Sequence, residues 1–253
     1  MKSSKRRRSA GGSALSVEGH SIPVSLRTHP RARRFSVRVK SATREVVIVH
    51  PIYAARSDAL AFAYANSEWI ASQLAALPRQ VPFAPGETVP VLGDPHRICH
   101  LPQACGGVWA DPETRRLTVT GRIEHVPRRL ADWFRTEARR LLTARVAVHV
   151  RALGLSLPRV TLRDTSSRWG SCSPRSGLSF SWRLAMAPEG VLDYVAAHEC
   201  AHLKHLHHGP AFWALVERLD PDYEAAEQWL KHQGSVLHAY GPVRRPASGP
   251  AAL

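Results

Sequence analysis

Two histidines and a glutamate in one short segment have the types and the spacing needed to hold a metal ion and move a proton. The segment is His198-Glu199-Cys200-Ala201-His202. Residues four apart on a helix project from the same face with Cβ atoms about 5–6 Å apart, so both imidazoles can bind one zinc ion. Glu199 is rotated by about 100° from His198, near enough to accept a proton from a water that the metal activates. We therefore expect one Zn2+ per chain, with Glu199 as general base.

The zinc ion needs a further histidine, because a catalytic zinc takes three protein ligands and leaves a fourth position open. Three histidines follow the segment, namely His205, His207 and His208. His205 lies on the same helical face as His198, but one straight helix does not easily place three ligands around one ion. His207 and His208 lie just before Gly209-Pro210, where a turn can bring a side chain back over the metal. The spacing alone does not choose between these two.

The segments that carry these residues resemble those of a known family. The pattern His198-Glu199-x-x-His202, then five residues, His208 and Gly209-Pro210-x-Phe212-Trp213, is similar to that of the YgjP-like metallopeptidase-type zinc hydrolases, relatives of the SprT-like zinc metalloproteins. A second similar segment is Arg168-Trp169-Gly170-Ser171-Cys172-Ser173, followed by Trp182-Arg183-Leu184 and Ala187-Pro188. The resemblance covers about residues 20–235.

This resemblance implies that His208 is the third ligand, together with His198 and His202. It also implies a zincin-like C-terminal half that contains the active-site helix. The chain departs from the family pattern at Cys200, where Leu is usual, and at Ser181, where Asn is common. Neither position is a ligand.

The segment 168–173 is also expected to border a substrate cleft. Its Gly-Ser-Cys-Ser sequence is compact enough for a substrate backbone to approach, so Arg168 and Ser171 are candidate cleft residues and Trp169 a candidate wall. Arg183 is a candidate for stabilising an oxyanion. The alternative interpretation is a tight structural turn with Trp169 in the core and Arg183 in a packing role.

Three functions from different classes fit these residues. The first is a metallopeptidase whose substrate is added as an extended strand beside residues 168–173. The second is a nucleoside triphosphate (pyro)phosphohydrolase in which Arg163, Arg168 and Arg183 hold phosphates. The third is a nucleic-acid-associated protein with a structural zinc. Glu199 argues against the third, because a structural site needs no general base.

The surrounding pattern predicts the elements that must position these residues. Alternating or continuous apolar runs at 22–26, 35–39 and 46–49 predict short strands, and Ser57 caps a helix that Pro78 ends. Frequent Pro and Gly across 81–121 indicate hairpins, and a long helix runs from Pro127 to Gly154. Strands at 160–162 and 178–182 and a helix from Pro188 precede two helices at 210–219 and 222–233. The expected fold is α+β, with a strand-rich N-terminal half and a helical C-terminal half.

Composition divides the chain into regions. We expect a disordered basic tail at 1–19, a β-rich region with one helix at 20–121, a catalytic region at 122–240 and a flexible tail at 241–253. The four cysteines do not form a disulfide scaffold, no apolar run reaches the length of a membrane span, and the N-terminus lacks the apolar part of a secretory signal. A cytoplasmic protein without a membrane partner is the expectation.

The net charge of +15, from 35 Lys and Arg against 20 Asp and Glu, allows weak binding of nucleic acid through a basic surface. Six of these cations lie between Arg27 and Lys40, and eight arginines lie between Arg122 and Arg151. Only 5 of the 35 are lysine. The alternative is therefore a compositional bias towards arginine with a solvated basic surface.

Overall fold

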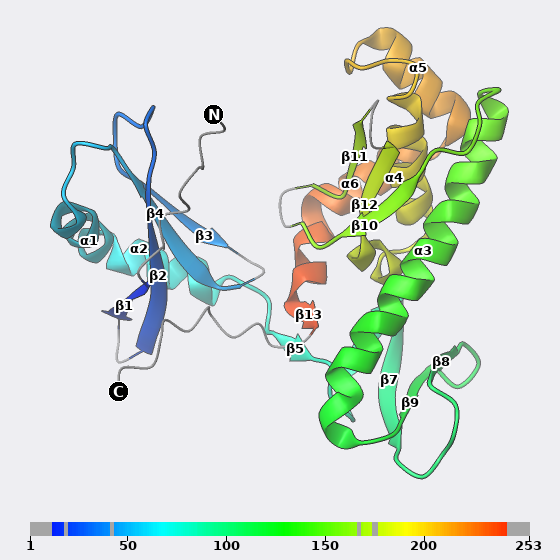
Figure 1. The fold of residues 1–253 in the computed structure, drawn as a ribbon, viewed down its shortest axis with the longest axis horizontal. Helices are drawn as coiled ribbons and strands as arrows, with labels where there is room; N and C mark the ends of the chain where they lie inside the picture. The colour runs from blue at the N-terminus through cyan, green and yellow to red at the C-terminus, as the bar shows by residue number, and fades with distance from the viewer. Residues whose placement is uncertain (1–11, 18–19, 41–42, 166–167, 174–176, 242–253) are drawn as a thin grey trace, which may run out of the picture. The chain divides into compact units, whose positions relative to one another are not determined.

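The computed structural model describes residues 12–17, 20–40, 43–165, 168–173 and 177–241. They form two compact units that divide between Pro78 and Arg79. The α+β class is confirmed, with strands concentrated in the first half of the chain and helices in the second (Figure 1). No helix in these ranges is long and apolar enough to cross a membrane.

The first unit is a four-stranded sheet with two helices. Its elements are β1 (Gly12–Val17), β2 (His20–Thr28), β3 (Ser36–Lys40), β4 (Glu45–His50), α1 (Arg56–Ala65) and α2 (Ser67–Ala75). The strand order is β1-β2-β4-β3. Val46 and Ile48 of β4 are buried in one cluster with Ala59, Ala63 and Ile70 of the helices. This cluster is separate from the core of the second unit.

Three expectations fail in this unit. Ser57 does not cap the first helix, because α1 begins at Arg56 with Ala55 as its N-cap. The tail over 1–19 is not wholly unstructured, because Gly12–Val17 pair antiparallel with β2 as strand β1. Residues 1–11 and 18–19 lie outside the described ranges. The single helix expected after Ser57 is two helices, which meet at Asn66. There the side-chain amide donates a hydrogen bond to the Phe62 carbonyl at 2.8 Å, a local bond that competes with continued helix.

The second unit begins with short strands and a long helix. Its first elements are β5 (Val81–Pro82), β6 (Thr88–Val91), β7 (Asp94–Leu101), β8 (Val108–Asp111), β9 (Arg116–Thr120), the 3₁₀ helix η1 (Ile123–His125) and α3 (Val126–Ala152). The sheet order is β6-β7-β9-β8. Ile98 and Leu117 of this sheet share one core with Leu130 and Phe134 of α3. The expected boundary between residues 121 and 122 is therefore wrong, because it would cut through this core.

A second sheet and the C-terminal helices complete the unit. They are β10 (Val160–Arg163), β11 (Gly170–Ser173), β12 (Gly177–Ser181), η2 (Trp182–Met186), α4 (Glu189–Ala201), α5 (Pro210–Leu219), α6 (Tyr223–Gln233), η3 (Gly234–Ala239) and β13 (Tyr240–Gly241). The sheet order is β10-β12-β11, so β11 is an edge strand. Gly241 lies in β13, which pairs with β5, while residues 242–253 of the expected flexible tail lie outside the described ranges.

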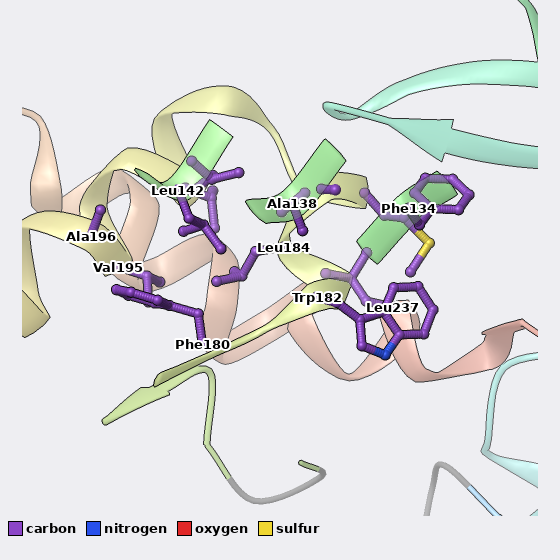
Figure 2. Close-up of a cluster of buried hydrophobic side chains, with 14 of the residues drawn as sticks. Phe134, Ala138, Leu142, Phe180, Trp182, Leu184, Val195, Ala196 and Leu237 are labelled. Atoms are coloured by element: carbon purple, nitrogen blue, oxygen red, sulfur yellow. The ribbon is translucent and has the colours of Figure 1, made fainter. Parts of the chain in front are cut away.

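The core of the second unit anchors α4. Figure 2 shows Phe134, Ala138 and Leu142 of α3 alongside Phe180, Leu184 and residues of α4. The α3 residues recur at intervals of four, which keeps them on one helical face. Val195 and Ala196 of α4 are buried in this cluster. The end of α4, which carries His198 and His202, is therefore held by a packed core rather than by a loop.

Candidate metal centre and active site

Three histidines converge at the C-terminal end of α4. His198 lies in the last turn of α4, His202 follows the helix as its C-cap, and His208 lies in the connection to α5. One ring nitrogen or equivalent ligand atom from each lies within 4.8 Å of the others. Nε2 of His198 and Nε2 of His208 are 3.2 Å apart. Two nitrogens bound to one tetrahedral zinc at about 2.0–2.1 Å lie about 3.4 Å apart, so the spacing fits a shared ion.

Contacts at the Nδ1 atoms of His202 and His198 set the orientation of these two rings. Nδ1 of His202 lies 3.0 Å from the carbonyl oxygen of His205. Since a carbonyl only accepts hydrogen bonds, Nδ1 carries the proton and Nε2 keeps its lone pair. Nδ1 of His198 lies 3.4 Å from the hydroxyl of Tyr194. Such outer contacts orient metal ligands and set their tautomers.

Phe212 of α5 forms an apolar wall against the three imidazoles. Its ring centroid lies 4.9 Å from that of His198, 4.6 Å from that of His202 and 4.7 Å from that of His208. Burial and the two neighbouring imidazoles lower the pKa of His198 to about 4. Burial also lowers the pKa of His202. Both rings are therefore neutral at neutral pH, the form in which histidine binds a metal.

Glu199 lies beside this centre with its carboxylate out of water. The residue is only 6% exposed, and its Oε2 has no hydrogen-bond partner within the part of the chain that the structure describes. Burial raises the pKa of Glu199 to about 7, against the opposing effect of the Arg168 charge. A buried carboxyl with an unpaired oxygen is costly to stability. Its place beside the histidines suits proton transfer near neutral pH.

Gly170 of β11 has no side chain, which leaves room for the side chain of Glu199. A Cβ atom at position 170 would lie 2.6 Å from Cγ and 2.8 Å from Cδ of Glu199. Real Cβ atoms do not approach other atoms so closely, so any residue other than glycine would displace the Glu199 side chain. The compact segment at 168–173 therefore accommodates the side chain of Glu199.

Two cavities meet at this segment. One, of about 220 Å³, is lined by Arg168, Trp169, Gly170, Tyr194, Val195, His198, Glu199 and Leu230. The other, of about 260 Å³, is lined by Arg163, Thr165, Arg168, Trp169, Gly170, Ser171, Ser179 and Phe180. They share residues 168–170. Of the four expected cleft residues, Arg168, Trp169 and Ser171 are thus brought to the site.

Trp169 combines the two roles that its sequence context suggested. Its ring stacks on His238, with centroids 5.1 Å apart and an interplanar angle of 20°. It also lines both cavities. One part of the indole is therefore fixed by packing while another part forms a wall of the site.

The expectation that Arg183 borders the cleft is wrong. Arg183 is only 4% exposed, and its Nε donates to Oδ1 of Asp164 at 2.9 Å. Its Nη1 donates to the carbonyl oxygens of Leu237 at 2.9 Å and Tyr240 at 2.5 Å. The guanidinium also lies over the ring of Trp182, 4.6 Å from the centroid. Arg183 therefore ties η2 to η3 and β13, which its sequence position did not reveal.

Sequence reasoning missed three residues that shape the centre. Tyr194 precedes His198 by four positions, a spacing that places both on one helical face and could have identified it. Phe212 was visible only as part of an aromatic pair after Gly209-Pro210. Gly170 could not have been found, because its partner Glu199 lies 29 positions away and only the fold brings them together.

The structure distinguishes His208 from the two other histidines that the sequence left as candidates for the third ligand. His205 contributes its carbonyl oxygen to His202, and His207 is exposed. Neither joins the cluster of described metal-ligating groups.

The two cysteines near the centre are packing residues. Cys200 is fully buried in the core, where burial raises the pKa of its thiol to about 12. Burial raises the pKa of Cys172 too, so both are protonated packing residues at neutral pH.

Comparison with known proteins agrees with the geometry of the centre. No protein of curated function and no solved structure matches the chain. The family described as the YgjP-like metallopeptidase domain matches residues 33–233. This range contains all three histidines, Glu199 and the 168–173 segment. The chain belongs to the YgjP-like metallopeptidase domain family.

Proposed function

We propose that this protein is a zinc-dependent hydrolase that cleaves peptides, with Glu199 as general base. His198, His202 and His208 would hold the ion, since three histidines whose ligand atoms lie within 4.8 Å of one another suit catalytic zinc. When bound, Zn2+ supplies a Lewis acid and lowers the pKa of a coordinated water towards about 7. The observation that carries the proposal is the buried Glu199 carboxylate, whose Oε2 lacks a partner among the described residues, beside these imidazoles.

Glu199 has the properties of a proton carrier. A pKa of about 7 lets the carboxylate accept a proton from the attacking water and release it again near neutral pH. For a peptide, the proton goes to the amine nitrogen as the C–N bond breaks. Gly170 holds the position of the carboxylate from below, because its lack of a side chain allows close packing.

The edge of β11 offers a place for an extended substrate. β11 pairs with β12 on one side only, so its other edge can accept a further strand through backbone hydrogen bonds. Gly170 of this strand lines both cavities. A peptide added along β11 would therefore run past Glu199 and reach Arg168 and Ser171.

Hydrolysis of a nucleoside triphosphate is the second candidate, and one observation favours it. Arg163 and Arg168 both line the cavity of about 260 Å³, together with the hydroxyl-bearing Thr165, Ser171 and Ser179. Neither guanidinium has an ion-pair partner in the described ranges. Paired arginines bind phosphate oxygens well. Arg183, expected to join them, is occupied by Asp164 and backbone carbonyls.

A paired hydrolysis screen tests the proposal. Wild-type protein and Glu199→Gln are incubated with a mixed peptide library and with nucleoside triphosphates, and new amino termini and released phosphate or pyrophosphate are measured. Because Gln cannot accept the proton, turnover should fall about 10²–10⁴-fold while the zinc content stays the same. Cleavage of triphosphates alone would select the second candidate. Zinc-loaded protein that hydrolyses neither class would favour a structural zinc and contradict the proposed chemistry.

A further inference from the structure

The first unit carries a run of positively charged residues that contains no acidic residue. Residues 20–44 contain six arginines and one lysine but neither Asp nor Glu. Five of the arginines are exposed and form what we call the arginine cluster: Arg27, Arg31, Arg33, Arg34 and Arg38. None of the five has an ion-pair partner within the ranges that the structure describes. Lys40 differs, because it pairs with Glu45.

In α3, the other arginine-rich segment of the chain, several arginines do have acidic partners. On α3, Arg128 and Arg135 pair with Asp132, and Arg140 pairs with Glu137. Arg145 pairs with Glu189 and Asp193 of α4. Four of the seven arginines of α3 therefore have an acidic partner, whereas no member of the arginine cluster has an ion-pair partner among the described residues. A compositional bias towards arginine explains the number of cations in both segments but not this difference.

Two members of the cluster share one face of the sheet. Arg27 of β2 lies opposite Val49 of β4, and Arg38 of β3 lies opposite Val47. Residues opposite each other in paired strands point to the same side. Val46 and Ile48 face the buried cluster with the helices, so Val47, Val49 and both arginines lie on the other face. With β4 between them, Arg27 and Arg38 stand about 10 Å apart across the strands.

The other three arginines lie on a braced loop. The connection between β2 and β3 is held by hydrogen bonds from His29 N to His50 O and from Ala32 N to His29 O, both 3.0 Å. The hydroxyl of Tyr53 donates to the carbonyl of Arg33 at 3.1 Å. Tyr53 is itself 78% exposed. The loop thus presents Arg31, Arg33 and Arg34 from a fixed backbone, with an accessible aromatic ring beside them.

We propose that the first unit binds nucleic acid through the arginine cluster. Exposed guanidinium groups without acidic partners neutralise phosphates and release counterions from the nucleic acid, which is the main source of binding affinity. The ring of Tyr53 can stack on a base that lies over the loop. An anionic membrane would also attract the arginines. However, Ile52 and Tyr53 are the large apolar side chains exposed beside this loop, too few for the inserted apolar face that interfacial membrane binding requires.

Matched neutralisations of the full chain test this proposal. Arg31→Gln/Arg33→Gln/Arg34→Gln removes three charges from the cluster, and Arg128→Gln/Arg140→Gln/Arg145→Gln removes three compensated charges from α3. Fluorescence anisotropy measures the affinity for labelled single-stranded and duplex 20-mers from 50 to 300 mM NaCl. The cluster variant should bind at least 10-fold more weakly at low salt. Its slope of log K against log salt should shrink by about 2–3, one phosphate contact per arginine. The α3 variant should stay within twofold of wild type.

Three results would overturn the proposal. They are undetectable binding of wild type at 50 mM NaCl, equal losses in the two variants, and tighter binding to phosphatidylserine vesicles than to nucleic acid at equal phosphate. Thermal unfolding of each variant shows that the losses do not come from misfolding. The cluster shares no residue with the metal centre, so binding should persist after chelation and in Glu199→Gln. Loss of the nucleic-acid proposal would therefore not affect the proposed hydrolase chemistry. Loss of the hydrolase proposal would likewise not affect the proposed nucleic-acid binding.

Discussion

The backbone of Gly170 in β11 packs directly beneath the carboxylate of Glu199 in α4, so closely that no Cβ atom fits between them. This contact joins the edge strand β11 to α4, the helix that carries His198 and Glu199. Glu199 is only 6% exposed, and its side chain also lines the cavity of about 220 Å³.

We expect Gly170→Ala to displace Glu199. The methyl group should lower the free energy of unfolding by about 1–3 kcal/mol, as overpacking does, and reduce turnover at least 10-fold while zinc remains bound. Ser171→Ala, at the adjacent position that lines the other cavity, is the matched control and should change stability little. In a Glu199→Ala background the cost of Gly170→Ala should largely disappear, because the clashing atoms are gone. Equal costs in both backgrounds, measured by denaturant unfolding, would refute this contact as the cause.

Removal of single histidines should distinguish the third ligand. His208→Ala should reduce zinc in the purified protein to well below one ion per chain, because Nε2 of His208 meets Nε2 of His198 at 3.2 Å. His207→Ala and His205→Ala should keep the metal, since neither side chain joins the cluster of described metal-ligating groups and His205 contributes its backbone carbonyl to His202. Elemental analysis after gentle purification measures all three. Similar zinc losses at the three positions would show that the ligand is misassigned.

Local rules predicted most helices of the second unit and the pairing of two of the three clustered histidines. Pro210 begins α5 and Pro127 lies in the first turn of α3, where proline's missing N–H costs no hydrogen bond. The spacing of His198 and His202 follows from the helical repeat. The choice of His208 needed the family resemblance, because the path of the chain after α4 depends on how Phe212 packs under the imidazoles.

Most features that the sequence did not predict depend on contacts between distant segments. The unit boundary at Pro78 follows from burial of Ile98 and Leu117 against α3, which no local pattern reveals. Arg183 resembled an anion-binding residue, since its partner Asp164 and the carbonyls of Leu237 and Tyr240 come from three other segments. Strand β1 was missed because its Gly- and Ser-rich sequence has low intrinsic strand propensity and forms by pairing with β2.

The raised pKa of Glu199 should make the stability of the zinc-free protein depend on pH. The value rises from 4.5 to about 7 on folding, so the folded state favours the protonated carboxyl. Below pH 4.5 the group is protonated in both states and has no effect. As pH rises through 7 the folded protein must bury a charge, which costs on the order of 3 kcal/mol. Glu199→Gln avoids this cost, so its advantage over chelated wild type should appear between pH 4.5 and 8. A difference in stability that is constant across this range would contradict the shift.

Arg183 and Arg168 should respond to substitution in opposite ways. Arg183→Met leaves Asp164 without its buried partner and frees two carbonyls, so the free energy of unfolding should fall by about 3 kcal/mol. Activity per folded molecule should be unchanged, because Arg183 lines neither cavity at the site. Arg168→Gln removes an exposed charge that lines both cavities, so the melting temperature should stay within about 2 °C of wild type while KM for the substrate rises. Thermal unfolding and steady-state kinetics on both variants measure these effects. A stable Arg183→Met protein with raised KM would contradict this structural role and show that Arg183 acts on the substrate.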